Sequence, residues 1–494
     1  MTQLDLAKME KRRSHVRPSL LALTALFAAT SLTPAIAHAD GVDAAQVQAL
    51  QEQIKQLQAE MDQLVANQVK VSAKPKVVYK KGKFSLSDGS GENTIAVTGR
   101  IHLDAGTYVA DKRKSASTPG YNPNGGFNAR RARIGVVGKI GGVWGYSFIY
   151  DAGNSDDSAP KGIQTAQVSY NGFNNTAIEF GYSDTFFSLD EATSSNDIMF
   201  MERATPGALA TGIAAGDFRS NIGARHWSDR YWVGAYFTGP AQGQGAGSHA
   251  FASQFGAFQR ASYQILQTKE YSLHVGAGAE ELLKAPTFSG AAALTLKDPP
   301  ELRVDGSPSL LSTGALGTTA NPLIGADVIN AEVAAVYHNY FLQSEYFHYS
   351  LDRRGLKNAS FNGAYGEVAW TITGESHKYK PETGAYGGIT PENPFDLQQG
   401  GLGAWELAAR VSYVGLNDNF VTGQTLATAP SAVAGGDQLN YTAGINWYVN
   451  NNMRFMLNYV HSNIRKTSIA AGGSLGKDIG ATVDAVGARA QVQF

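Results

Sequence analysis

The 494-residue sequence contains no cysteine and, beyond residue 39, no apolar run of 18 residues. Without cysteine, no disulfide can stabilise the fold. Without a long apolar run, no helix of the mature chain can span a membrane. Charged residues are also scarce, at 17%. Removal of residues 1–39 takes away 5 of the 41 basic and 2 of the 42 acidic residues, and the 36 and 40 that remain give no basic excess for nucleic acid.

The first 39 residues have the pattern of a secretory signal peptide. Basic residues come first, an apolar run from Leu20 to Leu32 follows, and the small residues Ala37 and Ala39 end the segment. The alternative is a membrane anchor, but the apolar run is too short to span a bilayer as a helix. We therefore expect residues 1–39 to be a signal peptide and the mature protein to leave the cytoplasm.

Residues 40–66 carry a heptad pattern, in which apolar residues recur at alternating intervals of three and four. This spacing is typical of the a/d seam of a coiled coil, and we interpret the segment as an oligomerising periplasmic helix. A lone amphipathic helix packed on a domain is the alternative. Residues 67–93 are polar and rich in Lys and Gly, so we expect a flexible linker there. The seam consists of Val47, Leu50, Ile54, Leu57, Met61 and Leu64.

Residues 94–494 alternate apolar and polar residues, as strands with two different faces do. We count about sixteen candidate strands, and their connections alternate between short turns and long loops, as in bacterial outer-membrane barrels. Residues 375–403 are an exception, because they fall on the side of the short turns and yet are long. They hold either a missed strand or a folded turn. The sequence predicts an all-β fold, a 16-stranded antiparallel transmembrane β-barrel with a short N-terminal periplasmic coiled coil, in the outer membrane of a Gram-negative cell.

The two faces of the candidate strands differ in chemistry. Trp144, Phe148 and Tyr150 share one face, which we expect to meet lipid, whereas polar residues and arginines occupy the other. A soluble sandwich would alternate too, but we would not expect its buried face to carry tyrosines at the ends of strands in a chain that also has a signal-peptide pattern and a terminal Phe. Sixteen strands leave a water-filled channel. The last strand ends on Phe494, which we expect the barrel-assembly machinery to read as an assembly signal.

Three stretches are similar to the phosphate-selective porins O and P. They read NARRARIGVVGKIGGVWGYSFIYD, SLDEATSSNDIMFMERATPG and GGLGAWELAARVSYVGLND, and the resemblance covers roughly residues 94–494. It implies a homotrimer of sixteen-stranded barrels, a third external loop at residues 183–216 that folds into the lumen, and lumen arginines that guide anions. The expected function is passive diffusion of small hydrophilic solutes, anions such as phosphate among them.

Arginines on the polar face are the candidate anion-guiding groups, because a guanidinium keeps its charge and offers planar donors to phosphate or carboxylate oxygens. For each arginine, the alternative is a structural ion pair with a lumen carboxylate such as Asp104, Glu179, Glu367 or Glu406. The wall candidates are Arg100, Arg131, Arg133, Arg225, Arg260 and Arg489. The constriction-loop candidates are Asp184, Asp190, Glu191, Glu202 and Arg203.

Asp184 departs from the family pattern, which has a lysine at this position before the constriction loop. From Tyr182 to Gly216 the sequence has no lysine, and the acids outnumber Arg203. A broad-specificity or sugar-passing porin of the same fold is therefore an alternative, and a barrel that displays its loops as an adhesin or has a structural role is another.

No enzymatic or metal-binding pattern stands out. Glu345 and His348 have the spacing of a metal pair on a helix, but on a strand they point to opposite faces. The histidines are scattered without partner spacing. We therefore expect no enzyme, no catalytic residues, no metal and no cofactor. The expected partners are outer-membrane lipid, further copies of the chain, the assembly machinery and small anionic or neutral solutes, and not nucleic acid.

Overall fold

The computed structural model describes residues 44–72, 74–80, 83–113, 123–153, 162–216, 218–241, 254–288, 290–304, 309–419, 428–469 and 475–494. The chain divides into two units, residues 1–72 and residues 73–494, which are described separately. The predicted signal peptide lies outside the described residues.

Helix α3 (Ala44–Ser72) is the described part of the first unit. It contains the heptad segment and continues beyond residue 66, the predicted end. The seam residues Leu50, Ile54, Leu57, Met61 and Leu64 are 49–68% exposed. Among the described helices, none has the length and apolar character needed to cross a membrane.

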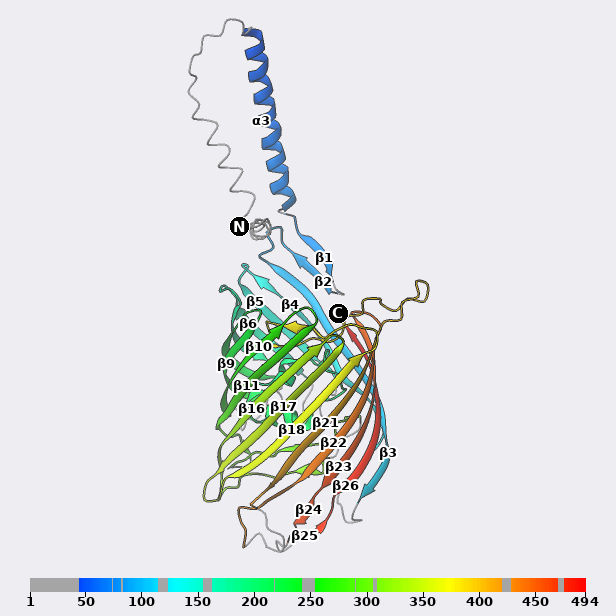
Figure 1. The fold of residues 1–494 in the computed structure, drawn as a ribbon. Helices are drawn as coiled ribbons and strands as arrows, with labels where there is room; N and C mark the ends of the chain where they lie inside the picture. The colour runs from blue at the N-terminus through cyan, green and yellow to red at the C-terminus, as the bar shows by residue number, and fades with distance from the viewer. Residues whose placement is uncertain are drawn as a thin grey trace. The chain divides into compact units, whose positions relative to one another are not determined.

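The second unit is a closed antiparallel barrel of sixteen strands (Figure 1), which confirms the predicted fold class. Each strand pairs with the next in the sequence, and β26 pairs with β3 to close the barrel. The barrel strands are β3 (Thr94–Arg113), β4 (Gly126–Ile140), β5 (Trp144–Asp151), β6 (Gly162–Tyr170), β7 (Thr176–Ser183), β8 (Arg219–Trp227), β9 (Tyr231–Ala241), β10 (Phe255–Gln267), β11 (Tyr271–Lys284), β16 (Leu323–Tyr337), β17 (Tyr340–Arg353), β18 (Ala359–Thr371), β21 (Ala404–Asp418), β22 (Val433–Tyr448), β23 (Met453–Arg465) and β26 (Ala481–Gln493).

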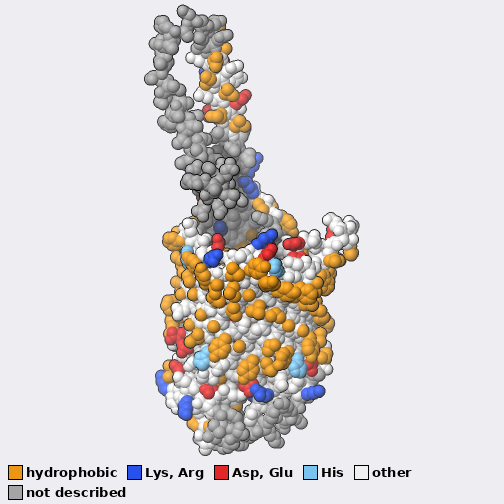
Figure 2. All heavy atoms as spheres, in the orientation of Figure 1, with side chains coloured by type: hydrophobic (Ala, Val, Ile, Leu, Met, Phe, Trp, Pro, Cys, Tyr) orange, Lys and Arg blue, Asp and Glu red, His pale blue; other side chains and the backbone are white. Residues whose placement is uncertain are grey.

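The barrel wall has the two faces that the sequence predicts. Phe148, Tyr150, Phe455 and Tyr459 are 41–47% exposed on the outside, and their neighbours along each strand point inward. Figure 2 shows the outward apolar side chains as a band around the wall, with charged side chains toward its two ends. Such a band matches the hydrocarbon layer of a membrane.

The C-terminal residue completes the closure of the barrel. Phe494 exchanges two backbone hydrogen bonds with Gly99 of β3, at 2.9 and 3.0 Å. A Cβ atom on residue 99 would lie only 2.5 Å from the ring carbon Cζ of Phe494, which is too close for any side chain. A glycine is therefore required at position 99 for the terminal ring to take this place.

The predicted linker, residues 67–93, is more ordered than the sequence suggests. It contains the end of α3 and a hairpin of β1 (Lys76–Lys80) and β2 (Lys83–Ser87), and β2 pairs with β3. The pairing with β3 explains the order, because a short hairpin gains stability when it extends an existing sheet.

Residues 372–403 form a folded turn rather than a missed barrel strand. The described turn contains the short pair β19 (Tyr379–Lys380) and β20 (Ala385–Tyr386), which bond to each other, and an isolated bridge between Asp396 and Gly401. At the opposite end of the barrel, residues 285–322 contain two further short pairs of strands. These are β12 (Thr287–Phe288) with β13 (Ala291–Ala292), and β14 (Lys297–Asp298) with β15 (Leu311–Ser312).

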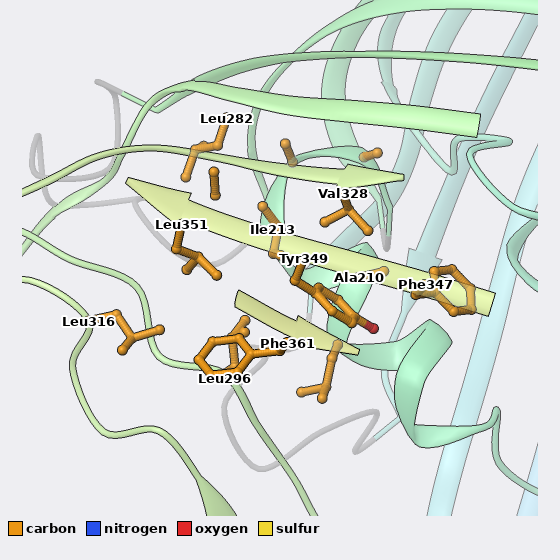
Figure 3. Close-up of a cluster of buried hydrophobic side chains, with 14 of the residues drawn as sticks. Ala210, Ile213, Leu282, Leu296, Leu316, Val328, Phe347, Tyr349, Leu351 and Phe361 are labelled. Carbon is orange, nitrogen blue, oxygen red and sulfur yellow. The ribbon is translucent and has the colours of Figure 1, made fainter. Parts of the chain in front are cut away.

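Apolar side chains fill one side of the barrel interior (Figure 3). Ala210 and Ile213 come from the loop between β7 and β8, Leu296 and Leu316 come from the loop between β11 and β16, and Tyr349 comes from β17. All five are at most 3% exposed. Both loops therefore pack against the inner wall instead of extending into solvent.

Candidate functional site: the constricted lumen

The loop of residues 184–218 lies inside the barrel. Strand β7 ends at Ser183, and the loop contains α4 (Leu189–Ala192), α5 (Thr205–Ala210) and the π-helical turn η1 (Thr211–Ala215). Ser188 accepts a hydrogen bond from the Glu191 backbone N–H at 3.2 Å and so caps α4. We call this segment the lumen loop, and the resemblance places residues 183–216, nearly the same segment, in the channel.

Inward side chains of the wall hold the backbone of the lumen loop. Glu345 of β17 accepts from the backbone N–H groups of Leu189 and Asp190, at 2.9 and 3.0 Å. On the far side, Asn458 of β23 accepts from the Met201 N–H at 2.8 Å. Because wall residues accept hydrogen bonds from the backbone of the lumen loop, the loop has a fixed position against the wall.

Glu202 is the centre of the ionic contacts between the lumen loop and the wall. It accepts two hydrogen bonds from Arg130, at 2.7 and 2.8 Å, and one from Arg489 at 3.2 Å. Burial alone would raise the pKa of Glu202, but Arg130, Arg303 and Arg489 together hold it well below its usual range. Glu202 therefore stays ionised as an anchor of the loop.

Arg203, the predicted cation of the constriction loop, is neutralised within the loop. Its guanidinium lies 3.2 Å from Asp190 and 3.3 Å from Glu191. Burial would lower the pKa of Arg203, but these two carboxylates raise it above its usual value. Three of the predicted constriction residues thus form one internal cluster that shapes the loop.

Four of the six predicted wall arginines form ion pairs with neighbouring carboxylates. The pairs are Arg133 with Asp151 at 2.6 Å, Arg225 with Glu179 at 3.1 Å, Arg260 with Glu332 at 2.8 Å and Arg489 with Asp104 at 2.7 Å. The ion-pair alternative, rather than a free cation, describes these four residues.

Arg100 and Arg131 differ from the other wall arginines. They lie on β3 and β4, where Arg100 is directly opposite Arg133, and His102 is directly opposite Arg131. Arg100 donates to the Ser195 hydroxyl at 2.6 Å, and Arg131 lies 3.4 Å from Nδ1 of His102. Within the part of the chain that the structure describes, neither guanidinium has a carboxylate at ion-pair distance. Arg100 thus contacts Ser195 of the lumen loop, and His102, the neighbour of Arg131, lies 3.0 Å from Asn196 of the same loop.

Asp184 lies in the lumen loop, one residue after β7 ends. Its carboxylate accepts from the Thr185 N–H at 3.0 Å. Asp184 and Asp197 are close enough to Arg100 to interact with its charge. These two acids of the lumen loop therefore lie on the side of the loop that is near Arg100.

The folded turn of residues 372–403 enters the lumen from the other end. Its Lys380 lies 2.6 Å from Asp197 of the lumen loop, and its backbone carbonyl at Gly384 accepts from Arg260 at 2.7 Å. The ring nitrogens of His377 lie 2.8 Å from the Gly387 carbonyl and 2.6 Å from the Glu406 carboxylate. Since both are acceptors, His377 makes both bonds only when it carries both protons.

Glu301 is a lumen residue that the sequence reading missed. It belongs to the loop of residues 285–322, and it bonds Arg410 and Ser412 of β21 and the Thr205 N–H of the lumen loop, the last at 3.0 Å. No periodic pattern surrounds Glu301, since it lies between short irregular strands. Because Glu301 and Arg410 are far apart in the sequence, no local pattern could have predicted their contact.

The family described as phosphate-selective porin O and P matches residues 95–494. Porin O of Pseudomonas aeruginosa is 25% identical over 404 residues, which cover 79% of this chain and 87% of Porin O. An uncharacterized protein of Caulobacter vibrioides is 27% identical over 383 residues, 75% of this chain and 69% of that protein.

Among solved structures, the chain is similar to OmpT, an outer membrane protein of Vibrio cholerae, with 11% identity and a TM-score of 0.47 over 81% of this chain and 99% of that one. An anion-selective porin from Comamonas acidovorans is 12% identical, with a TM-score of 0.46 over 82% of this chain and 100% of that one.

Proposed function

Since the chain belongs to the phosphate-selective porin O and P family, and is therefore an outer-membrane porin, we propose that its channel favours small anions such as phosphate. Arg100 and Arg131 are the residues that attract them. The charge balance beside the lumen loop supports this assignment. Of the predicted wall arginines, these two have no carboxylate at ion-pair distance among the described residues, so their charge is the least balanced.

The mechanism is passive diffusion with an electrostatic bias. A fixed positive charge in a narrow, partly dehydrated passage raises the local concentration of anions and lowers their barrier to passage. Arg100 lies beside the Ser195 hydroxyl and Arg131 beside His102, so the donors that we propose an anion meets there are the two guanidinium groups. The remaining predicted arginines shape the passage through their ion pairs.

The assay is the reversal potential of the purified channel across a KCl gradient, followed by titration of phosphate as a blocker. We expect Arg100→Gln and Arg131→Gln each to shift the reversal potential toward cations and to weaken the block by phosphate. The matched control is the double variant Arg133→Gln/Asp151→Asn, which removes a neighbouring ion pair without changing the net charge. Equal reversal potentials for wild type and both single variants would refute the proposal.

A broad-specificity porin is the second candidate. Asp184 and Asp197 interact with Arg100 across the passage, and acids on one side with bases on the other orient solutes without excluding one sign of charge. In that case the wild-type reversal potential stays close to zero, and a neutral sugar permeates as readily as phosphate in liposome swelling.

The quaternary structure belongs to the same proposal. Five seam residues of α3 are 49–68% exposed in a single chain, and a coiled coil of several copies would bury them. We propose a homotrimer with residues 40–66 as its helical part and residues 94–494 as the barrel. The same proposal includes a signal peptide at residues 1–39 and recognition of Phe494 by the assembly machinery.

A further inference from the structure

The long turn before β21 ends in a small hairpin on the rim of the barrel. This rim hairpin, residues 393–403, is closed by two backbone hydrogen bonds of 3.0 Å that Asp396 and Gly401 exchange. The Phe395 N–H donates to the carbonyl of Val449, in the turn between β22 and β23, at 2.8 Å. Part of the segment before β21 projects sideways from the rim, beside the C-terminus (Figure 1). The bonds thus fix the hairpin at the end of the barrel that carries the short turns, which is the periplasmic end.

The rim hairpin packs against aromatic side chains of the outer wall. Trp405 of β21, Trp447 of β22 and Phe455 of β23 are opposite one another in the sheet and share its outward face. Both indole N–H groups donate to the Leu402 carbonyl, at 3.3 and 2.9 Å. The rings of Phe395 and Trp447 make an edge-on contact, with centroids 5.2 Å apart. The hairpin therefore lies against the outer face of the wall rather than over the mouth of the channel.

The side chains that the rim hairpin exposes are apolar. Leu397 is 85% exposed, Leu402 is 67% exposed and Phe395 is 37% exposed. Asp396 is the one charged residue of the segment, and its carboxylate accepts hydrogen bonds from the backbone N–H groups of the two glutamines that follow Leu397, at 2.8 and 3.1 Å. The hairpin therefore presents leucines without a charge beside them, and such a surface suits a hydrocarbon environment.

The wall against which the hairpin packs has the features of a lipid-facing wall. Strands β21, β22 and β23 have 15, 16 and 13 residues, more than the about 9–11 that a tilted strand needs to span a membrane. Tyr413 and Tyr441 form a second outward aromatic row farther along these strands and are 40% and 47% exposed. Aromatic rows at both ends of a wall mark the two interfaces of a membrane. A neighbouring barrel on this side would cover both rows, whereas lipid accounts for them.

We propose that the rim hairpin is a lipid anchor in the periplasmic leaflet of the outer membrane. Leu397 and Leu402 insert among the upper acyl chains, and Trp405 and Trp447 lie at the level of the head groups. The hairpin extends the aromatic row of the wall outward along the same interface. Since it belongs to the turn that also enters the lumen, the anchor holds that turn at a fixed depth in the membrane.

The absence of cysteine from the chain allows a test with single thiols. The full-length protein, with Leu397→Cys as its sole thiol, is labelled with a fluorophore and reconstituted in vesicles of phosphatidylethanolamine and phosphatidylglycerol. Lipids that carry a nitroxide on the upper acyl chain should quench this label strongly. The matched control is Lys269→Cys, an exposed position in the short turn between β10 and β11 at the same end of the barrel, and its label should be quenched less.

The contribution of the leucines is measured with Leu397→Ser/Leu402→Ser, with a label at Gln398→Cys as the reporter. Burial of one leucine side chain shifts an equilibrium at least roughly tenfold, so the ratio of inserted to withdrawn hairpin should fall about 100-fold. Quenching at residue 398 should then fall to the level of the Lys269→Cys control.

Three outcomes would overturn the proposal. The first is equal quenching of the labels at residues 397 and 269, and the second is unchanged quenching at residue 398 in the serine variant. The third is a disulfide between copies at residue 397 without quenching by lipid, which would assign the leucines to a contact with a second copy. If aqueous iodide quenches the label at residue 397 and the lipid nitroxide does not, the hairpin lies in water and the proposal is equally wrong.

Discussion

Glu202→Gln should loosen the lumen loop while the barrel itself stays closed. The carboxylate accepts two hydrogen bonds from Arg130 and one from Arg489, and it is 6% exposed. The amide of glutamine has nearly the same shape but no charge, so the change removes the ionic contact without opening a cavity. The strands keep their backbone pairing, including the closure of β26 on β3.

The size of the free-energy cost of Glu202→Gln follows from the burial of this ion pair. Removal of one partner of a buried ion pair costs about 3–5 kcal/mol, because the other charge stays buried without its counter-charge. Arg489 keeps Asp104 at 2.7 Å, and the glutamine oxygen can still accept one hydrogen bond, so the lower end of this range applies. A cost of about 3 kcal/mol changes the ratio of displaced to seated loop roughly 150-fold.

Single-channel recording in planar bilayers detects the displaced loop. We expect Glu202→Gln to show more open-channel noise and transitions to a larger conductance than the wild type. The folded barrel should still appear as a heat-modifiable band in gel electrophoresis. Glu392→Gln is the matched control, because Glu392 is an exposed side chain of the turn at residues 372–403. Identical noise and conductance in Glu202→Gln and wild type would refute the assigned role of this ion pair.

Acid gives an independent check on the same contact. The pKa of Glu202 is held below its usual range in the folded protein, so its contribution is present above the unfolded-state pKa of about 4.3. That contribution is lost only as the pH falls through the lower folded-state value. Noise in the wild-type channel should therefore stay constant from pH 7 down to about pH 4.3.

Four further predictions address other parts of the chain. Deletion of Phe494, whose ring fills the space left at residue 99, should leave export intact and strongly lower the outer-membrane yield; an equal yield would contradict this. Leu57→Asp should abolish association of an isolated peptide of residues 40–66 in analytical ultracentrifugation, because it buries a charge in the seam; a wild-type peptide that stays monomeric would contradict the seam. Asp184→Lys should shift the reversal potential toward anions, whereas Asp229→Lys at an exposed turn should change it little; equal effects would remove Asp184 from the passage. Finally, burial would lower the pKa of His377 but Glu406 raises it, so the stability from this contact is present below about pH 6.5 and lost as the pH rises through the folded-state value; His377→Gln should abolish that part of the pH dependence in thermal unfolding.

The strand pattern could be predicted because it is local. Alternation of period two is a property of neighbouring residues, and it placed Trp144 and Phe455 on the outside and Arg489 on the inside, as the structure has them. The connections were equally readable, since a turn such as Gly141-Gly142 requires positive φ angles, 59° and 76°, that glycine adopts without strain. Local sequence patterns thus predict where the strands and turns of the barrel lie.

The partners of the lumen arginines could not be predicted, because they depend on contacts between distant segments. Arg489 meets Asp104 only when the barrel closes, across 385 positions of sequence. Arg130 meets Glu202 only when the lumen loop is seated. The alternation shows that an arginine points inward, but the register of the closed sheet and the depth of the loop decide whether a carboxylate faces it.

The ion pairs of the lumen separate the shape of the channel from its selectivity. A loop inside a barrel must satisfy its backbone N–H and C=O groups, and charged side chains such as Glu345 and Arg454 supply strong partners for them. Other charged side chains of the lumen are balanced by an opposite charge, as Arg260 is by Glu332, and such a pair holds the structure and adds little net field. We propose that the selectivity depends on Arg100 and Arg131, the two predicted wall arginines that have no carboxylate at ion-pair distance among the described residues. Consequently, the charge-neutral double variant Arg133→Gln/Asp151→Asn should lower the thermal stability of the barrel and leave the reversal potential unchanged. Arg100→Gln should instead shift the reversal potential and leave the thermal stability unchanged. A shift of the reversal potential by the double variant would show that paired charges also guide the solute.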